Sequence, residues 1–104
     1  MKSYTDLEQS KKLAEILPVE NADMYYAYDI VYAIPYKNGI GTEKPCWSLA
    51  ALLSHIPNVS LHHTPSGWRA DSFTERKSVF GPLQDEPIDA CYEMILKLHE
   101  QKLL

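Results

Sequence analysis

Cys46 is the residue whose type and position most directly suggest chemistry in this chain. It follows Pro45 at the expected start of a helix, where the partial positive charge of the first amides lowers the pKa of a thiol. A catalytic thiolate would also need a histidine base within hydrogen-bond reach. The chain has four histidines: His55, His62, His63 and His99. None carries a local signature for this role, so a small Cys/His enzyme using Cys46 is an alternative, and packing beside Trp47 is the preferred interpretation.

Two adjacent histidines, His62 and His63, are the strongest hint of a metal site. Neighbouring residues on a strand point to opposite faces, however, so the pair is poorly suited to chelating one ion. The two cysteines, Cys46 and Cys91, are far apart and belong to no CxxC motif. We therefore predict two buried thiols, a histidine pair on the surface of a hairpin, and no metal, disulfide or other cofactor.

Trp68 lies close in sequence to three cations: Arg69, Arg76 and Lys77. An aromatic ring beside positive charge is typical of proteins that hold single-stranded nucleic acid. Four acidic residues of the same region would repel phosphate: Asp71, Glu75, Asp85 and Glu86. The net charge is -4 and the chain has no basic stripe, so nucleic-acid binding is disfavoured. An acidic inhibitor of a host nucleic-acid enzyme, mimicking phosphate, is a second alternative.

Tyrosines are the best candidates for a binding surface. The sequence lacks a phosphate-binding glycine loop, a nucleophile elbow and an HExxH motif, so no catalytic residue is assigned. Residues 23–36 contain five of the seven tyrosines: Tyr25, Tyr26, Tyr28, Tyr32 and Tyr36. Tyrosine joins apolar area to a hydroxyl group, which favours half-exposed sheet faces and interfaces. We predict that these residues, with Trp68, bind a protein partner, and packing in the core is the competing interpretation.

Length and composition indicate an ordinary globular protein. The chain has 104 residues, of which 45% are hydrophobic and 23% charged, so we predict one domain over residues 1–104. The N-terminus lacks the profile of a signal peptide, and no apolar run approaches the ~18–20 residues of a membrane span. These features predict a cytoplasmic protein without a membrane partner.

The N-terminal half is predicted to contain a helix followed by a strand. Thr5-Asp6-Leu7-Glu8 forms a capping box with Thr5 as the N-cap, and Pro18 ends the helix. The tyrosine segment alternates with a period of two and predicts a strand, most firmly over residues 29–36. Pro35 places that strand at an edge or an end, and Asn38-Gly39 predicts a tight turn to a short partner strand through Thr42.

The C-terminal half is predicted to contain two helices around a hairpin. Pro45 and Pro57 bracket the first of these helices. Residues 58–73 alternate around a Thr-Pro-Ser-Gly turn, and residues 75–80 extend this hairpin or add a strand. The last helix begins at Asp85-Glu86-Pro87. The order α-β(β)-α-β-β-α predicts an α+β fold in which three helices pack on a small antiparallel sheet of three to five strands, as a two-layer or α/β/α sandwich.

The chain combines a first helix, a Trp-Ser helix that reads Cys46-Trp47-Ser48-Leu49-Ala50-Ala51-Leu52-Leu53, a hairpin bearing a tryptophan, and a last helix that opens Pro87-Ile88-Asp89-Ala90-Cys91. This order of motifs resembles small uncharacterised proteins of phages, prophages and mobile elements, particularly the phage ABA sandwich domain. The resemblance implies a sandwich fold encoded on a mobile element. It supplies no catalytic residue. We therefore expect a non-enzymatic accessory protein that acts through protein contacts, as a homodimer, with residues 25–36 at a sheet edge.

Overall fold

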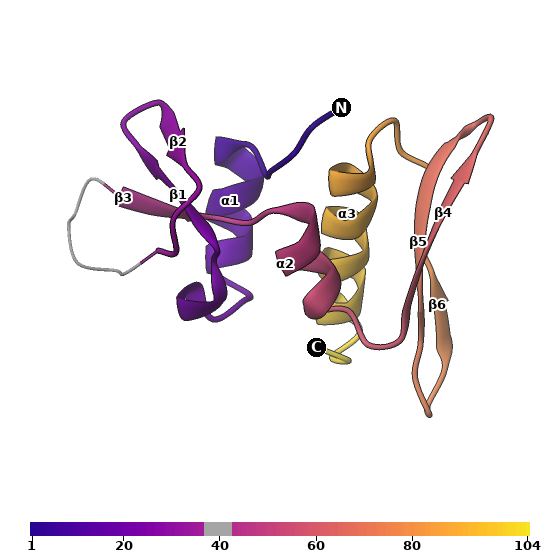
Figure 1. Ribbon diagram of the computed structural model, residues 1–104. Coiled ribbons are helices and arrows are strands. Elements are labelled where there is room, and N and C mark those ends of the chain that lie inside the picture. The colour runs from indigo at the N-terminus through magenta and orange to yellow at the C-terminus, as the bar shows by residue number, and fades with distance from the viewer. Residues whose placement is uncertain (37–42) are drawn as a thin grey trace. The chain divides into compact units, whose positions relative to one another are not determined.

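The computed structural model describes residues 1–36 and 43–104, and it confirms the α+β class (Figure 1). Within these residues the chain forms three α-helices, one short 3-10 helix and six strands in two antiparallel sheets of three strands each. The predicted single sheet of three to five strands is therefore two smaller sheets. The chain divides into two compact units, one comprising Ser3–Ala51 and the other Met1–Lys2 with Leu52–Leu104. The prediction of a single domain over residues 1–104 stays a prediction.

The first helix, α1 (Leu7–Ala14), starts one residue later than predicted. Its N-cap is Asp6, whose carboxylate accepts from the Gln9 amide at 2.8 Å, while the Gln9 side chain accepts from the Asp6 amide at 3.1 Å. This is the reciprocal capping box expected from the sequence pattern, shifted by one residue. Thr5 has a different role because its side chain is buried and bonds to other parts of the unit. A 3-10 helix, η1 (Val19–Asn21), follows Pro18.

The tyrosine segment forms a hairpin and is not one continuous strand, and of the range predicted most firmly, residues 29–36, only Ile30–Tyr32 is a strand. Strand β1 (Met24–Ala27) turns through two residues into β2 (Ile30–Tyr32), and β3 (Glu43–Cys46) pairs with the other edge of β1. The sheet order is β2-β1-β3. Alternation cannot reveal this turn, because Tyr28-Asp29 contains no glycine or proline and continues the period of two. The predicted Asn38-Gly39 turn and the strand through Thr42 lie outside the described residues.

The helix predicted between Pro45 and Pro57 is shorter, and α2 comprises only Leu49–Ser54. Pro45 and Cys46 instead end strand β3. The helix begins after Ser48, whose hydroxyl accepts from the Ala51 amide at 3.2 Å in the manner of an N-cap. Proline is tolerated at the start of a helix and also at a strand position that donates no hydrogen bond to a neighbouring strand. Pro45 alone therefore could not show whether a helix or a strand lies there.

The second unit contains the predicted tryptophan hairpin, a third strand and the last helix. β4 (Val59–Thr64) and β5 (Gly67–Phe73) pair around the Pro65-Ser66 turn, and β6 (Ser78–Phe80) pairs with β5, which gives the order β4-β5-β6. Helix α3 (Pro87–Glu100) packs on β5. Close packing requires glycine beside this sheet, because a Cβ atom at Gly81 would lie 2.7 Å from the Ala70 carbonyl oxygen.

Helix α3 begins with the predicted proline at N1, but its N-cap does not use its side chain in the predicted way. The Glu86 carboxylate makes no cap bond to the helix and accepts from the Lys2 backbone amide at 3.0 Å. The Lys2 ammonium group donates to Asp89 at 2.7 Å. These two contacts fix the first residues of the chain to the start of α3. The buried stripe of the helix is broader than periodicity alone predicts: Ile88, Ala90, Cys91, Met94, Ile95 and Leu98.

Candidate protein-binding face

The sheet of the Ser3–Ala51 unit has two distinct faces. Across the sheet, Tyr25 pairs with Tyr32 and Pro45, and Ala27 pairs with Ile30 and Glu43. Because residues directly opposite each other share a face, these side chains form two rows on one side of the sheet. We call this side the open face and define it by six residues: Tyr25, Ala27, Ile30, Tyr32, Pro45 and Glu43. The alternate residues, including Tyr26 and Cys46, lie on the other side.

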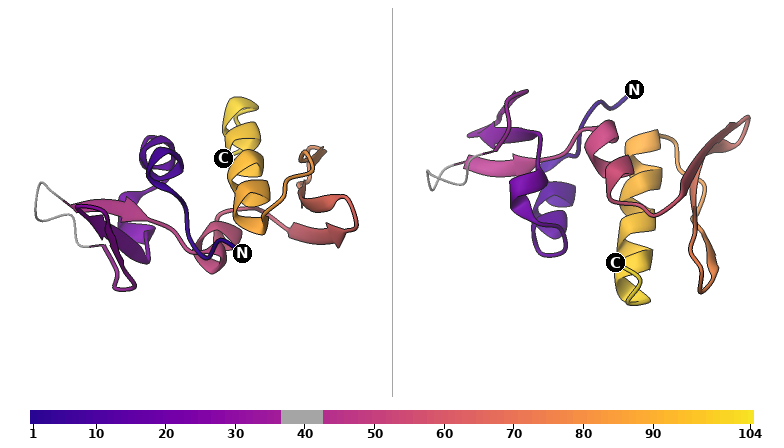
Figure 2. Two further views of the ribbon diagram at one scale, coloured as in Figure 1. Left: turned by 90° about the horizontal axis from the view of Figure 1, so that it is seen from above. Right: turned by 60° about the horizontal axis from the view of Figure 1, so that its bottom comes forward.

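Helix α1 lies beside β3 (Figure 2), and Thr5, which precedes the helix, contacts the side of the sheet opposite the open face. The Tyr26 hydroxyl donates to the Thr5 carbonyl oxygen at 2.8 Å, and the Cys46 thiol donates to the same oxygen at 3.4 Å. The Thr5 hydroxyl in turn accepts from the Trp47 amide at 3.2 Å and bonds to the Ser10 hydroxyl at 2.8 Å. These bonds satisfy polar groups that are almost fully buried, so this side is structural.

Burial shifts the titration of both ionisable groups in that contact. The pKa of Tyr26 rises from 10.0 to about 12, first because burial disfavours the phenolate and then because Cys46 lies nearby. The pKa of the Cys46 thiol is also raised, chiefly by burial, although hydrogen bonds from Thr5 and Ser10 oppose the shift. Cys46 lies on a strand and not in the first turn of a helix, so the dipole expected to lower its pKa is absent.

The open face presents Ile30 and Tyr32 to solvent, whereas Pro45 is buried and the other members are half-buried. The rings of Tyr25 and Tyr32 stack with centroids 5.1 Å apart and an interplanar angle of 16°. Ile30 is 59% exposed and Tyr32 is 38% exposed. Ile34, which follows β2, is also largely exposed. Stacked tyrosines beside exposed aliphatic groups are typical of surfaces that bind proteins.

Tyr28, at the tip of the hairpin, has an unfavourable backbone conformation. Its φ angle is 58°, in the left-handed region that favours glycine, and its side chain is 80% exposed. A bulky residue in this conformation costs on the order of 1 kcal/mol, and its exposed ring contributes little burial in return. Strained residues cluster at functional sites, so this exposed ring is a candidate for contact with a partner.

The six predicted binding residues divide into four groups, of which Trp68 is the last. Tyr25, Tyr28 and Tyr32 lie on or next to the open face. Tyr26 is buried on the opposite side, so it is part of the core. Tyr36 is half-buried and its amide donates to the Ala22 carbonyl oxygen at 3.2 Å.

Trp68 belongs to the other compact unit. Its ring stacks on His63 with centroids 4.1 Å apart, and its backbone exchanges hydrogen bonds with Gln84 at 2.7 and 2.8 Å. The predicted edge position holds for β2 alone, because β1, which carries Tyr25 and Tyr26, is the central strand.

Sequence reasoning missed Ala27, Ile30, Ile34 and Glu43 as members or neighbours of this surface. The sequence did contain a sign of Ile30 and Ile34, because both are apolar residues close to the tyrosines. Recognising Ala27 and Glu43 required the pairing of β1 with β3, which connects residues on either side of the undescribed segment. Strand register is a tertiary property that alternation within one strand does not specify.

The histidine pair has the predicted geometry. His62 and His63 occupy successive positions of β4, pairing with Arg69 and Trp68 respectively, so they lie on opposite faces. Within residues 1–36 and 43–104, no group of three metal-ligating side chains comes together. Burial lowers the pKa of His55, which favours its neutral form near neutral pH.

Ser60, His62 and Asp71 lie close together but lack the geometry of a catalytic triad. The Ser60 hydroxyl is 3.0 Å from His62 Nε2, and Asp71 Oδ2 is 3.1 Å from the same nitrogen. A proton relay needs serine and aspartate at different ring nitrogens. Asp71 is almost fully buried, and Arg69 balances its charge through contacts of 3.0 and 3.1 Å. The cluster is best explained as an ion pair in which Arg69 balances the charge of a buried carboxylate.

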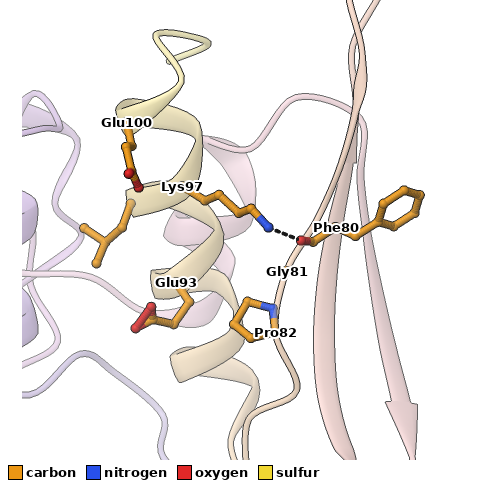
Figure 3. A pocket seen from close by; sticks show the side chains of 7 residues that line it. Phe80, Gly81, Pro82, Glu93, Lys97 and Glu100 are labelled. Carbon is orange, nitrogen blue, oxygen red and sulfur yellow. Dashed lines mark hydrogen bonds between the residues drawn. The ribbon is translucent and has the colours of Figure 1, made fainter.

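A groove of about 500 Å³ runs between α3 and the segment after β6 (Figure 3). The Lys97 ammonium group crosses it and donates to the Phe80 carbonyl oxygen at 2.7 Å. Figure 3 shows the Phe80 ring directed away from α3, and Glu93 and Glu100 directed away from the Lys97 ammonium group. The polar groups of the groove therefore do not converge on a common point, as a small-molecule site requires.

None of the described helices has the length and apolar character needed to cross a bilayer. No protein-family model, curated protein or solved structure matches the chain.

Proposed function

We propose that this chain is a non-enzymatic binding protein that contacts a protein partner through the open face and Tyr28. The observation that carries the proposal is the combination of a strained, 80% exposed Tyr28 with the exposed Ile30 and the stacked Tyr25–Tyr32 pair. Three exposed large side chains of one short hairpin, Tyr28, Ile30 and Tyr32, are more than isolated surface apolar residues require.

The resemblance to the phage ABA sandwich domain supports an accessory role of the kind found in phages and mobile elements. Such proteins need no catalytic centre, and the chain's own chemistry agrees with this role. Cys46 is fully buried and has a raised pKa, which is the opposite of an activated nucleophile. We propose an intracellular protein partner or a second copy of the chain, and we assign no nucleic acid and no cofactor.

Paired variants test the proposal. Ile30→Thr with Tyr32→Ser removes apolar area from the open face and should reduce capture of a partner from the producing cells at least tenfold. The control is Phe73→Ser with Phe80→Thr, which removes exposed apolar area of similar extent from the other unit, where the two residues are 41% and 52% exposed. Equal loss with both pairs, or loss with the control alone, would refute a role specific to the open face. Sedimentation of the wild-type chain over a range of concentrations tests the homodimer separately.

A further inference from the structure

Ala27 has the smallest side chain on the open face and lies in its central strand. Ile30 and Glu43 are its cross-strand neighbours, and Tyr25 lies two positions earlier on the same side. Neighbours of this kind lie about 5–8 Å apart. A small residue is therefore surrounded by an aliphatic side chain, an aromatic ring and a carboxylate.

The open face carries one charged residue, and that residue is acidic. Of the charged residues in β1, β2 and β3, Glu43 lies on the open face and Lys44 on the opposite side. Asp29 is exposed at the hairpin tip beside Tyr28. Residues 3–51 contain four lysines and seven acidic residues, so the whole unit is acidic. A complementary partner brings positive charge, whereas a second copy would bring another Glu43 and another Asp29 to the same place.

We infer that the open face binds a basic segment of another protein and seats an arginine or lysine side chain over Ala27, between Tyr25 and Glu43. This inference rests on the proposed function and specifies the partner for the same face. A cation is attracted to the face of a tyrosine ring within about 6 Å of its centroid. The Glu43 carboxylate supplies the opposite charge, and Ile30 packs on the aliphatic part of the partner's arginine or lysine side chain.

Titration of defined peptides into the isotopically labelled protein, followed by NMR, tests the inference. Three acetylated and amidated seven-residue peptides are compared, each rich in valine and threonine and differing only in arginine, glutamine or glutamate at the centre. The arginine peptide should shift the amide signals of Tyr25, Ala27 and Glu43 and bind at least about threefold more tightly than the glutamine peptide. The glutamate peptide should bind most weakly.

Charge variants separate a specific contact from general attraction. Glu43→Gln should weaken binding of the arginine peptide about two- to fivefold, the range of an exposed ion pair. Glu20→Gln changes the net charge equally at an exposed site on η1 and should leave the affinity unchanged.

Equal binding of all three peptides, no shift with the arginine peptide, or equal effects of the two charge variants would overturn the inference. So would a partner that proves to be a second copy of the chain docked on this face. These results differ from failure of the proposed function, which would leave partner capture unchanged when Ile30 and Tyr32 are replaced.

Discussion

The Tyr26 hydroxyl donates to the Thr5 carbonyl oxygen at 2.8 Å and so joins the central strand β1 to the residue that precedes the N-cap of α1. Tyr25, the adjacent residue, points to the opposite side of the sheet and stacks on Tyr32. One tyrosine therefore stabilises the unit while its neighbour contributes to an exposed face. This division is the basis on which structural and binding effects can be separated by mutation.

Tyr26→Phe should lower the free energy of unfolding by about 1 kcal/mol, because the variant loses a buried hydrogen bond and leaves the Thr5 carbonyl oxygen less satisfied. Tyr25→Phe is the matched control, since it removes the same atom from the open face and should change stability by less than about 0.5 kcal/mol. Urea denaturation of the three proteins measures both changes. Equal effects of the two substitutions would contradict the assignment of the two sides.

The stability of the protein should fall as the pH rises above about 9 to 10. An unfolded tyrosine loses its proton near pH 10, whereas the native pKa of Tyr26 is about 12, so stability is fully present below pH 10 and declines between these values. The pKa of Cys91 is raised by burial from 9.0 to about 12, which gives a decline in the same direction from about pH 9. Each group contributes a slope of up to about 1.4 kcal/mol per pH unit.

Denaturation curves at several pH values check this dependence. The stability difference between the wild type and Tyr26→Phe should shrink between about pH 10 and pH 12, because only the wild type has this group to titrate. A difference that stays constant through this interval would show that Tyr26 is not protected by burial.

Both thiols should resist iodoacetamide in the native protein near neutral pH. Cys46 and Cys91 have no exposed surface, and burial raises the pKa of both groups, so the reactive thiolate is scarce and inaccessible. Mass spectrometry should find alkylation only after denaturant is added. Rapid modification of Cys46 before unfolding would revive the Cys/His enzyme alternative.

Tyr28→Gly should stabilise the protein by up to about 1 kcal/mol and, at the same time, weaken binding to the partner. Glycine adopts the observed φ of 58° without the steric cost that tyrosine incurs, and the lost ring is 80% exposed. Thermal denaturation and partner capture, measured on the same samples, give the two results. Lower stability together with unchanged capture would contradict a functional explanation of this residue.

The sequence predicted elements well where the alternation of apolar and polar residues agreed with the positions of turn and helix-start residues. The Thr64–Gly67 turn and its alternating flanks form the hairpin of β4 and β5, and Pro87 starts α3. Prediction failed at Tyr28-Asp29, because a turn without glycine or proline keeps the alternation of a strand. It also failed at Cys46, since a proline can precede a helix or occupy a strand.

The candidate site was half predictable. The excess of tyrosine indicated a surface, and Tyr25, Tyr28 and Tyr32 lie on it or beside it. Which tyrosine faces the core depends on the contact of Tyr26 with Thr5, and the position of Glu43 beside Ala27 depends on the register of β3. Both are long-range relationships that local patterns do not encode.

Photo-cross-linking from the hairpin tip tests the central claim most directly. Benzoylphenylalanine placed at position 28 should give a discrete adduct with a partner protein in the producing cells, because the side chain there is 80% exposed beside the open face. The same group at position 73, an exposed phenylalanine of the other unit, is the control and should give none. An adduct from position 73 but not from position 28, or equal adducts from both, would contradict a binding function located on the open face.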